Sequence, residues 1–149
     1  MKFTVAALTL TATMALGAFS ARGVVGAQVA KNQWEGVYTQ DQATRGEALY
    51  AQSCASCHGP DLAGGEMAPG LTGGEFSSNW NDLSIGDLFD RIRISMPQNA
   101  PGSLSRQQNA DILAFMLLKA SVPAGTTELP TQSEVLSTIK FVASRPTGN

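Results

Sequence analysis

The chain has 149 residues, which is room for one domain with a single hydrophobic core. Its 12 acidic and 10 basic residues give a formal net charge of −2 at neutral pH, with histidine counted as neutral. No Lys/Arg-rich patch or helix is present, which argues against nucleic acid as a partner, and the acidic balance favours a partner with a basic docking face.

The N-terminal segment has the pattern of an export signal. Lys2 precedes an apolar run over residues 3–19, and Val25-Gly26-Ala27 places small residues at positions −3 and −1 of a cleavage site. We therefore predict a signal peptide over residues 1–27. An uncleaved anchor is the alternative, but four threonines make the run a poor membrane-spanning helix. Cleavage removes two basic residues and no acidic one, so the net charge falls from −2 to −4.

A first helix is predicted after Thr39. Thr39-Gln40-Asp41-Gln42 reads as a capping box, and apolar residues at near-helical spacing follow it to Ser53. Gly46 within this segment is either a tolerated weak position or a point where another helix crosses closely, and we favour the crossing.

The two cysteines and the single histidine of the chain stand together as Cys54-Ala55-Ser56-Cys57-His58. This is the C-x-x-C-H pattern of covalent haem attachment. The two thiols add across the vinyl groups of one porphyrin, and the adjacent imidazole is the proximal iron ligand. We therefore predict one haem c held by Cys54 and Cys57, with His58 bound to the iron.

The cysteine pair has four other interpretations. A zinc site needs four protein ligands, and the chain has no second Cys/His pair. A thioredoxin-type pair needs a βαβ context, whereas the flanking sequence reads as helix. A structural disulfide across so short a span would restrict the unfolded chain very little. Chance surface cysteines are the remaining alternative.

The segment after the motif alternates loops and helices. Residues 59–74 are rich in Gly and Pro, so we expect a loop that wraps the haem edge. Ser84, with Asp87 at the third position, caps a middle helix that Pro97 ends. Ser105-Arg106-Gln107-Gln108 caps a third helix that stops at Val122-Pro123.

A short terminal helix is predicted after Thr131-Gln132-Ser133-Glu134, which reads as a further capping box. Two roles stay open for it, packing on the domain and docking to a partner. The predicted organisation is a signal peptide (1–27), an N-terminal extension (28–37), a haem domain (38–121) and a C-terminal extension with a short helix (122–149).

The sixth iron ligand must be something other than a second histidine of this chain, and a methionine thioether is the leading candidate. Met116 falls on the apolar stripe of the third helix, so we expect it in the core. Met67 lies in the loop expected on the proximal side of the haem. Met96 lies at the end of a helix, immediately before Pro97. We assign Met96 as the sixth ligand, with Met67 as the alternative.

Over essentially the whole mature chain, the sequence resembles class I cytochromes c. The resemblance rests on the order of three segments around the haem motif: Gly46-Glu47-Ala48-Leu49-Tyr50, Ala68-Pro69-Gly70-Leu71-Thr72-Gly73 and Ser95-Met96-Pro97. It implies the all-α cytochrome c fold, with three main helices plus short helices and loops around one covalent haem. It also implies that the Pro69 carbonyl accepts a hydrogen bond from Nδ1 of His58, and that the first and third helices cross near Gly46 and Phe115.

A narrower resemblance, to small cytochromes associated with quinoprotein alcohol dehydrogenases, rests on two segments. These are Met96-Pro97 with the following Pro101-Gly102-Ser103-Leu104-Ser105, and the helix segment Asp111-Ile112-Leu113-Ala114-Phe115. Three further residues are candidate partners of the haem propionates, because indole and guanidinium N–H groups suit carboxylates: Trp80, Arg91 and Arg93. The alternative is that Trp80 is a core residue and the arginines are solvated.

The predicted function is single-electron transfer in the periplasm, without catalysis by the chain itself. The expected partners are redox proteins such as a quinoprotein dehydrogenase or a terminal oxidase, and no stable membrane span is expected after cleavage. Two alternatives stay open. One is a haem enzyme or gas sensor with an open sixth iron position, and the other is a dedicated cytochrome subunit of a quinoprotein dehydrogenase.

Overall fold

The structure is a computed structural model that describes residues 32–147. The predicted signal peptide and its cleavage site lie outside the described residues. Within the described range the chain is all-α, as expected, and its three longest helices are α1 (Gln40–Ser53), α4 (Ile85–Ser95) and α5 (Arg106–Lys119). The shorter elements are the 3-10 helix η1 (Gln33–Glu35), α2 (Ala55–His58), α3 (Gly73–Trp80) and α6 (Ser133–Leu136).

The three long helices begin where their capping residues predicted. The Thr39 hydroxyl accepts a hydrogen bond from the Gln42 backbone N–H at 3.2 Å. Ser84 forms a complete capping box with Asp87, and Ser105 forms one with the residue three positions later. Local side-chain chemistry therefore sets these three starting points.

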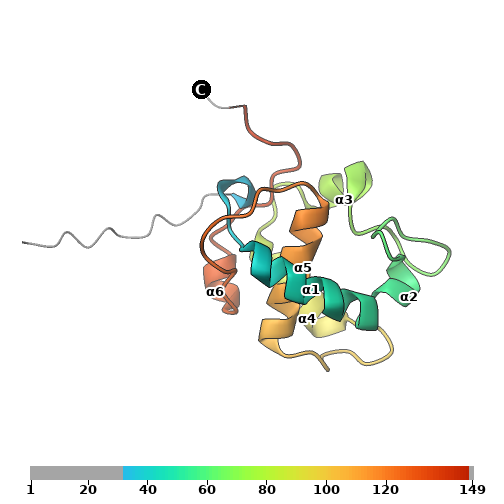
Figure 1. Ribbon diagram of the computed structural model, residues 1–149. Coiled ribbons are helices and arrows are strands. Elements are labelled where there is room, and N and C mark those ends of the chain that lie inside the picture. The colour runs from blue at the N-terminus through green and yellow to red at the C-terminus, as the bar shows by residue number, and fades with distance from the viewer. Residues whose placement is uncertain (1–31, 148–149) are drawn as a thin grey trace, which may run out of the picture.

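Helices α1 and α5 cross near the middle of the molecule (Figure 1). At the crossing, a Cβ atom on Gly46 would clash with the backbone carbonyl oxygen of Asp111, so a side chain does not fit there. One turn further along both helices, the rings of Tyr50 and Phe115 pack with centroids 5.4 Å apart. The predicted crossing is confirmed, with Asp111 rather than Phe115 opposite the glycine.

Helix α3 was not predicted from the sequence. It begins at Gly73, inside the segment expected to be a loop, and its N-cap residue Thr72 makes no side-chain capping bond. The ring of Phe76 on this helix packs edge-on against Phe141, with centroids 6.2 Å apart. The sequence of α3 gives little local indication of a helix, but in the fold this helix packs against a segment that is distant in sequence.

The C-terminal segment packs into the same core as the helices, which is the first of the two roles considered for it. Its buried hydrophobic residues are Val122, Leu129, Leu136, Ile139 and Phe141. Gln42, fully buried on α1, donates from Nε2 to the Leu129 carbonyl at 3.2 Å and accepts from the Leu129 N–H at 2.7 Å. The predicted capping box at Thr131 does not form, because Gln132 is the N-cap of α6 and its side chain makes no capping bond.

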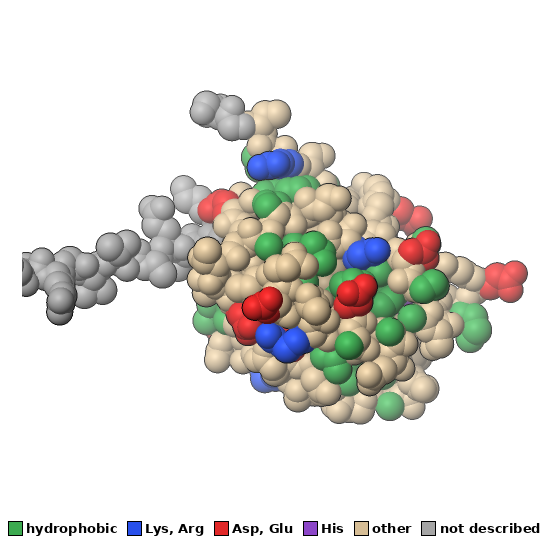
Figure 2. All heavy atoms as spheres, in the orientation of Figure 1, with side chains coloured by type: hydrophobic (Ala, Val, Ile, Leu, Met, Phe, Trp, Pro, Cys, Tyr) green, Lys and Arg blue, Asp and Glu red, His purple; other side chains and the backbone are tan. Residues whose placement is uncertain are grey.

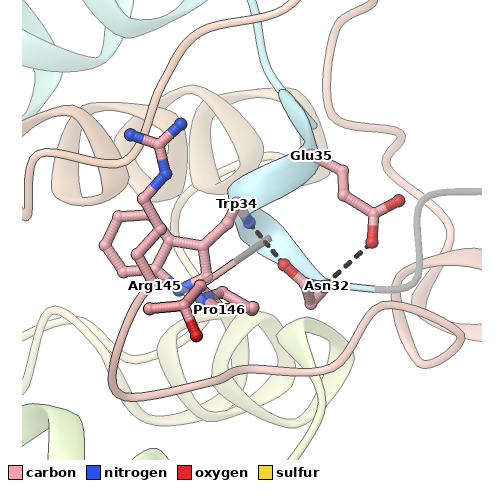
Figure 3. Close-up of a pocket in the computed structure, with 6 residues that line it drawn as sticks. Asn32, Trp34, Glu35, Arg145 and Pro146 are labelled. Carbon is pink, nitrogen blue, oxygen red and sulfur yellow. Dashed lines mark hydrogen bonds between the residues drawn. The ribbon is translucent and has the colours of Figure 1, made fainter. Parts of the chain in front are cut away.

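The N-terminal segment pairs with the end of the same terminal segment. Gln33 donates to the Val142 carbonyl at 2.7 Å and accepts from the Val142 N–H at 2.9 Å. Beside this pairing, Trp34, Arg145 and Pro146 line a hollow (Figure 3). None of its lining residues comes from the Cys-Cys-His motif or the loop after it. Among residues 32–147, no helix is long and apolar enough to cross a membrane.

Candidate haem site

The Cys-Cys-His motif forms one tight turn at the end of α1. The Cys54 N–H donates to the Tyr50 carbonyl at 2.9 Å, and the Cys54 carbonyl accepts from Cys57 and His58 at 3.2 and 3.0 Å. Both cysteines are free, Cys54 half-buried and Cys57 exposed. The turn thus presents two thiols and an imidazole from five consecutive residues, as attachment to a single porphyrin requires.

Burial affects the titration of the first thiol. It raises the pKa of Cys54 to about 11, and the neighbouring Cys57 adds to the shift. The thiol of Cys54 is therefore neutral at physiological pH. A thioether carries no titratable proton, so haem attachment at this position removes the group from acid–base chemistry.

His58 is buried, with 8% of its surface exposed. Its Nδ1 lies 2.8 Å from the carbonyl oxygen of Pro69. A carbonyl oxygen only accepts hydrogen bonds, so Nδ1 is the donor, and in the neutral imidazole Nε2 then carries the lone pair. The imidazole is thereby fixed in the tautomer and orientation of an Nε2 metal ligand.

The loop that presents the Pro69 carbonyl is held by its own backbone. Gly64 donates to the His58 carbonyl at 2.9 Å, and Leu71 donates to the Leu62 carbonyl at 2.8 Å. Leu62 is fully buried, and a Cβ atom on Gly64 would clash with the backbone at Gly70. The Gly-rich composition therefore permits the backbone of this loop to pack closely on itself. In Figure 1 the loop lies beside α2.

Tyr50 also supports the motif, a role that sequence reasoning missed. Its hydroxyl donates to the Gly59 carbonyl at 2.6 Å, which ties α1 to the residue after His58. Burial raises the pKa of Tyr50 to about 12, so the hydroxyl keeps its proton for this bond. The position of Tyr50, one helical turn before Cys54, is the signal that could have revealed this contact.

The three methionines among residues 32–147 differ sharply in burial. Met116 is 3% exposed in the core, as expected, whereas Met67 is 78% exposed on the loop. Met96 is half-buried against the edge of the core, where it forms the C-cap of α4. Its backbone N–H donates to the Ile92 carbonyl at 2.9 Å. Of the two candidate ligands, Met96 is therefore the one held by the fold.

The predicted propionate partners have different environments. Trp80 is half-buried on α3, with its ring centroid 6.1 Å from that of Phe76. Arg93 forms an ion pair with Asp90 at 2.9 Å, and Arg91 is exposed. Arg93 is thus already engaged on its own helix, and Trp80 is neither fully core nor fully solvated.

These residues fit a covalent haem. The donor set comprises two free thiols, an imidazole with an available Nε2 and a half-buried thioether. The segments after the motif also carry half-buried apolar side chains: Leu71, Phe76, Trp80, Met96 and Leu104. A large apolar macrocycle is the kind of group that would cover such side chains.

The charge distribution is uneven around this site. Seven acidic residues and no Lys or Arg lie between Arg45 and Arg91, the part of the chain that contains the motif, its loop and α3. Figure 2 shows acidic side chains along the edge where Figure 1 places this loop. This part of the surface therefore favours an approaching group of positive charge.

Comparisons with known proteins support the fold of the chain. A search of curated proteins found no match. The chain is similar to a solved structure, the sulfane dehydrogenase SoxCD from Paracoccus pantotrophus, with 25% sequence identity and a TM-score of 0.52. The match covers 76% of this chain but only 61% of that chain. It does not concern a quinoprotein alcohol dehydrogenase, so the narrower resemblance gains no support from it.

The family match covers the residues of the site. Residues 41–116 match the family described as cytochrome C oxidase, cbb3-type, subunit III, and this range contains the haem motif, its loop, α4 and most of α5. The all-α cytochrome c fold, a covalent haem c and electron transfer follow from this match. The chain therefore belongs to this family of c-type cytochromes, with Cys54 and Cys57 as its haem attachment residues.

Proposed function

We propose that this cytochrome carries single electrons with His58 and Met96 as the two axial ligands of its iron. When bound, the haem supplies an iron that alternates between the ferrous and ferric states. The observation that carries the proposal is the 2.8 Å bond from His58 Nδ1 to the Pro69 carbonyl, which leaves Nε2 free to bind a metal. His58 is the only histidine in the chain, so the opposite ligand must be of another type.

Met96 is the best-supported opposite ligand. It is half-buried and its backbone is bonded to α4, whereas Met67 is 78% exposed and Met116 is enclosed in the core. A thioether favours the ferrous state and raises the reduction potential. With both axial positions filled by side chains, small molecules are kept from the metal, which suits a carrier rather than an enzyme or a gas sensor.

The proposed setting is the periplasm, reached through the predicted signal over residues 1–27. The electron partner is a redox protein, either a dehydrogenase, including one of the quinoprotein type, or a terminal oxidase. A family named for an oxidase subunit and a similar structure named for a dehydrogenase support these two classes. The acidic stretch between Arg45 and Arg91 supports a basic docking face on that partner.

The test is the absorption spectrum of the ferric protein, matured with its haem. Methionine ligation gives a weak far-red band, which we expect in the wild type and in Met67→Ala but not in Met96→Ala. Reduced wild-type protein should also bind carbon monoxide poorly. A band that survives in Met96→Ala would overturn the ligand assignment, and ready binding of carbon monoxide would favour an open-site enzyme or sensor.

The same preparation tests the export step. Intact mass should equal one haem on a chain that starts at Gln28, and a pyridine haemochrome spectrum should be of the c type. A chain that retains residues 1–27 after production in cells with an export pathway would contradict the predicted cleavage without affecting the haem assignment.

A further inference from the structure

One buried amide lies at the start of α5 with half of its hydrogen-bonding capacity unused. Asn109 is fully buried, and its Nδ2 donates to the carbonyl oxygens of Leu104 at 3.1 Å and Ser105 at 2.8 Å. Its Oδ1 has no partner among residues 32–147. Both bonded atoms are carbonyl oxygens, so the NH₂ group must face them and the amide cannot be turned round.

For stability alone, the amide is a poor choice at this position. A buried oxygen without a partner is unfavourable, and an apolar side chain of the same shape would avoid that penalty. The Ser105 carbonyl also accepts the backbone N–H of Asn109 at 3.0 Å, so it does not depend on the side chain. The particular contribution of the amide is its bond to Leu104, the residue before the capping box of α5.

That bond fixes one end of the segment that begins with Met96. At the other end, the Met96 N–H is bonded to the Ile92 carbonyl at 2.9 Å. Between the two ends the segment makes two turns of its own, and its residues 98–103 are exposed. Leu104 is half-buried against the core, so the bond from Asn109 holds the point where the exposed segment rejoins the fold.

We propose that Asn109 is a positioning residue for Met96. By holding the Leu104 carbonyl, it restricts the segment from Met96 to Ser105 and so opposes movement of the sulfur away from the iron. This role rests on the proposed ligation of iron by Met96. In this role Asn109 does not contact the haem itself.

The test compares two leucine variants of the haem-loaded full chain. Asn109→Leu removes the hold on Leu104 while keeping the side-chain shape. Gln42→Leu is the matched control, because Gln42 is also a fully buried amide that holds a backbone carbonyl, that of Leu129 on the terminal segment. The readouts are the affinity of the ferric protein for imidazole, which competes with the methionine, and carbon monoxide binding to the ferrous protein.

Loss of one such hydrogen bond should raise the apparent imidazole affinity of Asn109→Leu by up to about tenfold. Carbon monoxide binding should become faster in this variant. In Gln42→Leu, chemical denaturation should occur at lower urea, while both ligand-binding readouts stay at wild-type values. This pattern separates control of the iron ligand from general loss of stability.

The outcomes distinguish the two proposals. A wild-type protein without the far-red band would overturn Met96 ligation and the role of Asn109 with it. A normal wild-type band, with Asn109→Leu no more reactive than Gln42→Leu, would overturn the role of Asn109 alone. If Asn109→Leu does not fold, Asn109→Ser replaces it, since a serine hydroxyl bonds the carbonyl four residues back but does not reach Leu104. The same increase in imidazole affinity is expected.

Discussion

The Nδ1 atom of His58 and the carbonyl oxygen of Pro69 are 2.8 Å apart, and this bond joins the haem motif to the loop that follows it. A hydrogen bond from Nδ1 makes the imidazole a stronger electron donor at Nε2. With His58 as the proposed iron ligand, a stronger donor stabilises ferric iron, so the geometry of the loop influences the reduction potential. The backbone hydrogen bonds within the loop, which hold the Pro69 carbonyl in place, therefore also influence this potential.

We expect Pro69→Ala to raise the reduction potential. Alanine keeps the carbonyl but does not fix φ as proline does, so the hydrogen bond from His58 weakens. The imidazole is then a weaker donor, and the ferric state is less stabilised. A change of up to about 60 mV corresponds to a tenfold change in a one-electron equilibrium. A redox titration followed by absorbance measures it. Pro146→Ala, an exposed proline outside the loop, is the control and should leave the potential unchanged; a fall in Pro69→Ala would contradict the argument.

Gly46→Ala should destabilise the protein strongly. A Cβ atom at this position would clash with the Asp111 carbonyl, so α1 and α5 must move apart, at a cost of about 3 kcal/mol or more. Gly74→Ala is the matched control, because a Cβ atom there has no neighbour within 4 Å. The control should change stability by less than about 1 kcal/mol. Urea denaturation followed by circular dichroism distinguishes the two variants. Equal denaturation midpoints would show that the crossing of α1 and α5 can accommodate a Cβ atom.

Two neighbours on α6 test whether the terminal segment stabilises the haem domain. Leu136 is fully buried, whereas Val135 is 46% exposed. Leu136→Ala should cost about 2–5 kcal/mol of unfolding free energy, through lost burial and a residual cavity. Val135→Ala should change it by less than about 0.5 kcal/mol. If the terminal segment unfolded separately, Leu136→Ala would leave the main denaturation transition in place.

The capping box of α4 should make stability depend on acid. Hydrogen bonds from Ser84, its hydroxyl first and then its backbone N–H, lower the pKa of Asp87. A lowered pKa in the folded state gives stability that is present above the unfolded pKa of about 4 and lost as pH falls through the folded value. Asp87→Asn should therefore be less stable than wild type at pH 7, and the difference should narrow toward pH 3.

Urea denaturation at both pH values measures this effect. Glu134→Gln, an exposed substitution on α6, controls for the change of one charge. A difference between wild type and Asp87→Asn that stays constant or grows toward pH 3 would contradict the assigned cause. The same result in Glu134→Gln would point to general electrostatics instead.

Much of the fold was predictable because its signals are local. The haem motif lies within five consecutive residues, and Ser84 and Ser105 mark helix starts through bonds to residues three positions away. The burial of Met116 also follows from helical spacing. These features depend on residues that are close in sequence, so they can be recognised from the sequence alone.

The rest depends on contacts between distant parts of the chain. Gln42 looked like the end of a capping box, but its side chain pairs with the backbone of Leu129. Helix α3 begins with two glycines and packs through Phe76 on Phe141. Asn109, inside a well-predicted helix, gave no sign that it bonds back to Leu104. Such pairings become visible only once the chain is folded.

The depth of Phe141 in the core has a consequence for the order of assembly. Phe141 lies more than eighty residues after His58, yet it packs on α3 and is 4% exposed. In any delivery of the chain with its N-terminus first, the cysteines therefore arrive long before the core can close around them. An attachment machinery that needs an accessible motif would meet it in this interval, before folding buries His58.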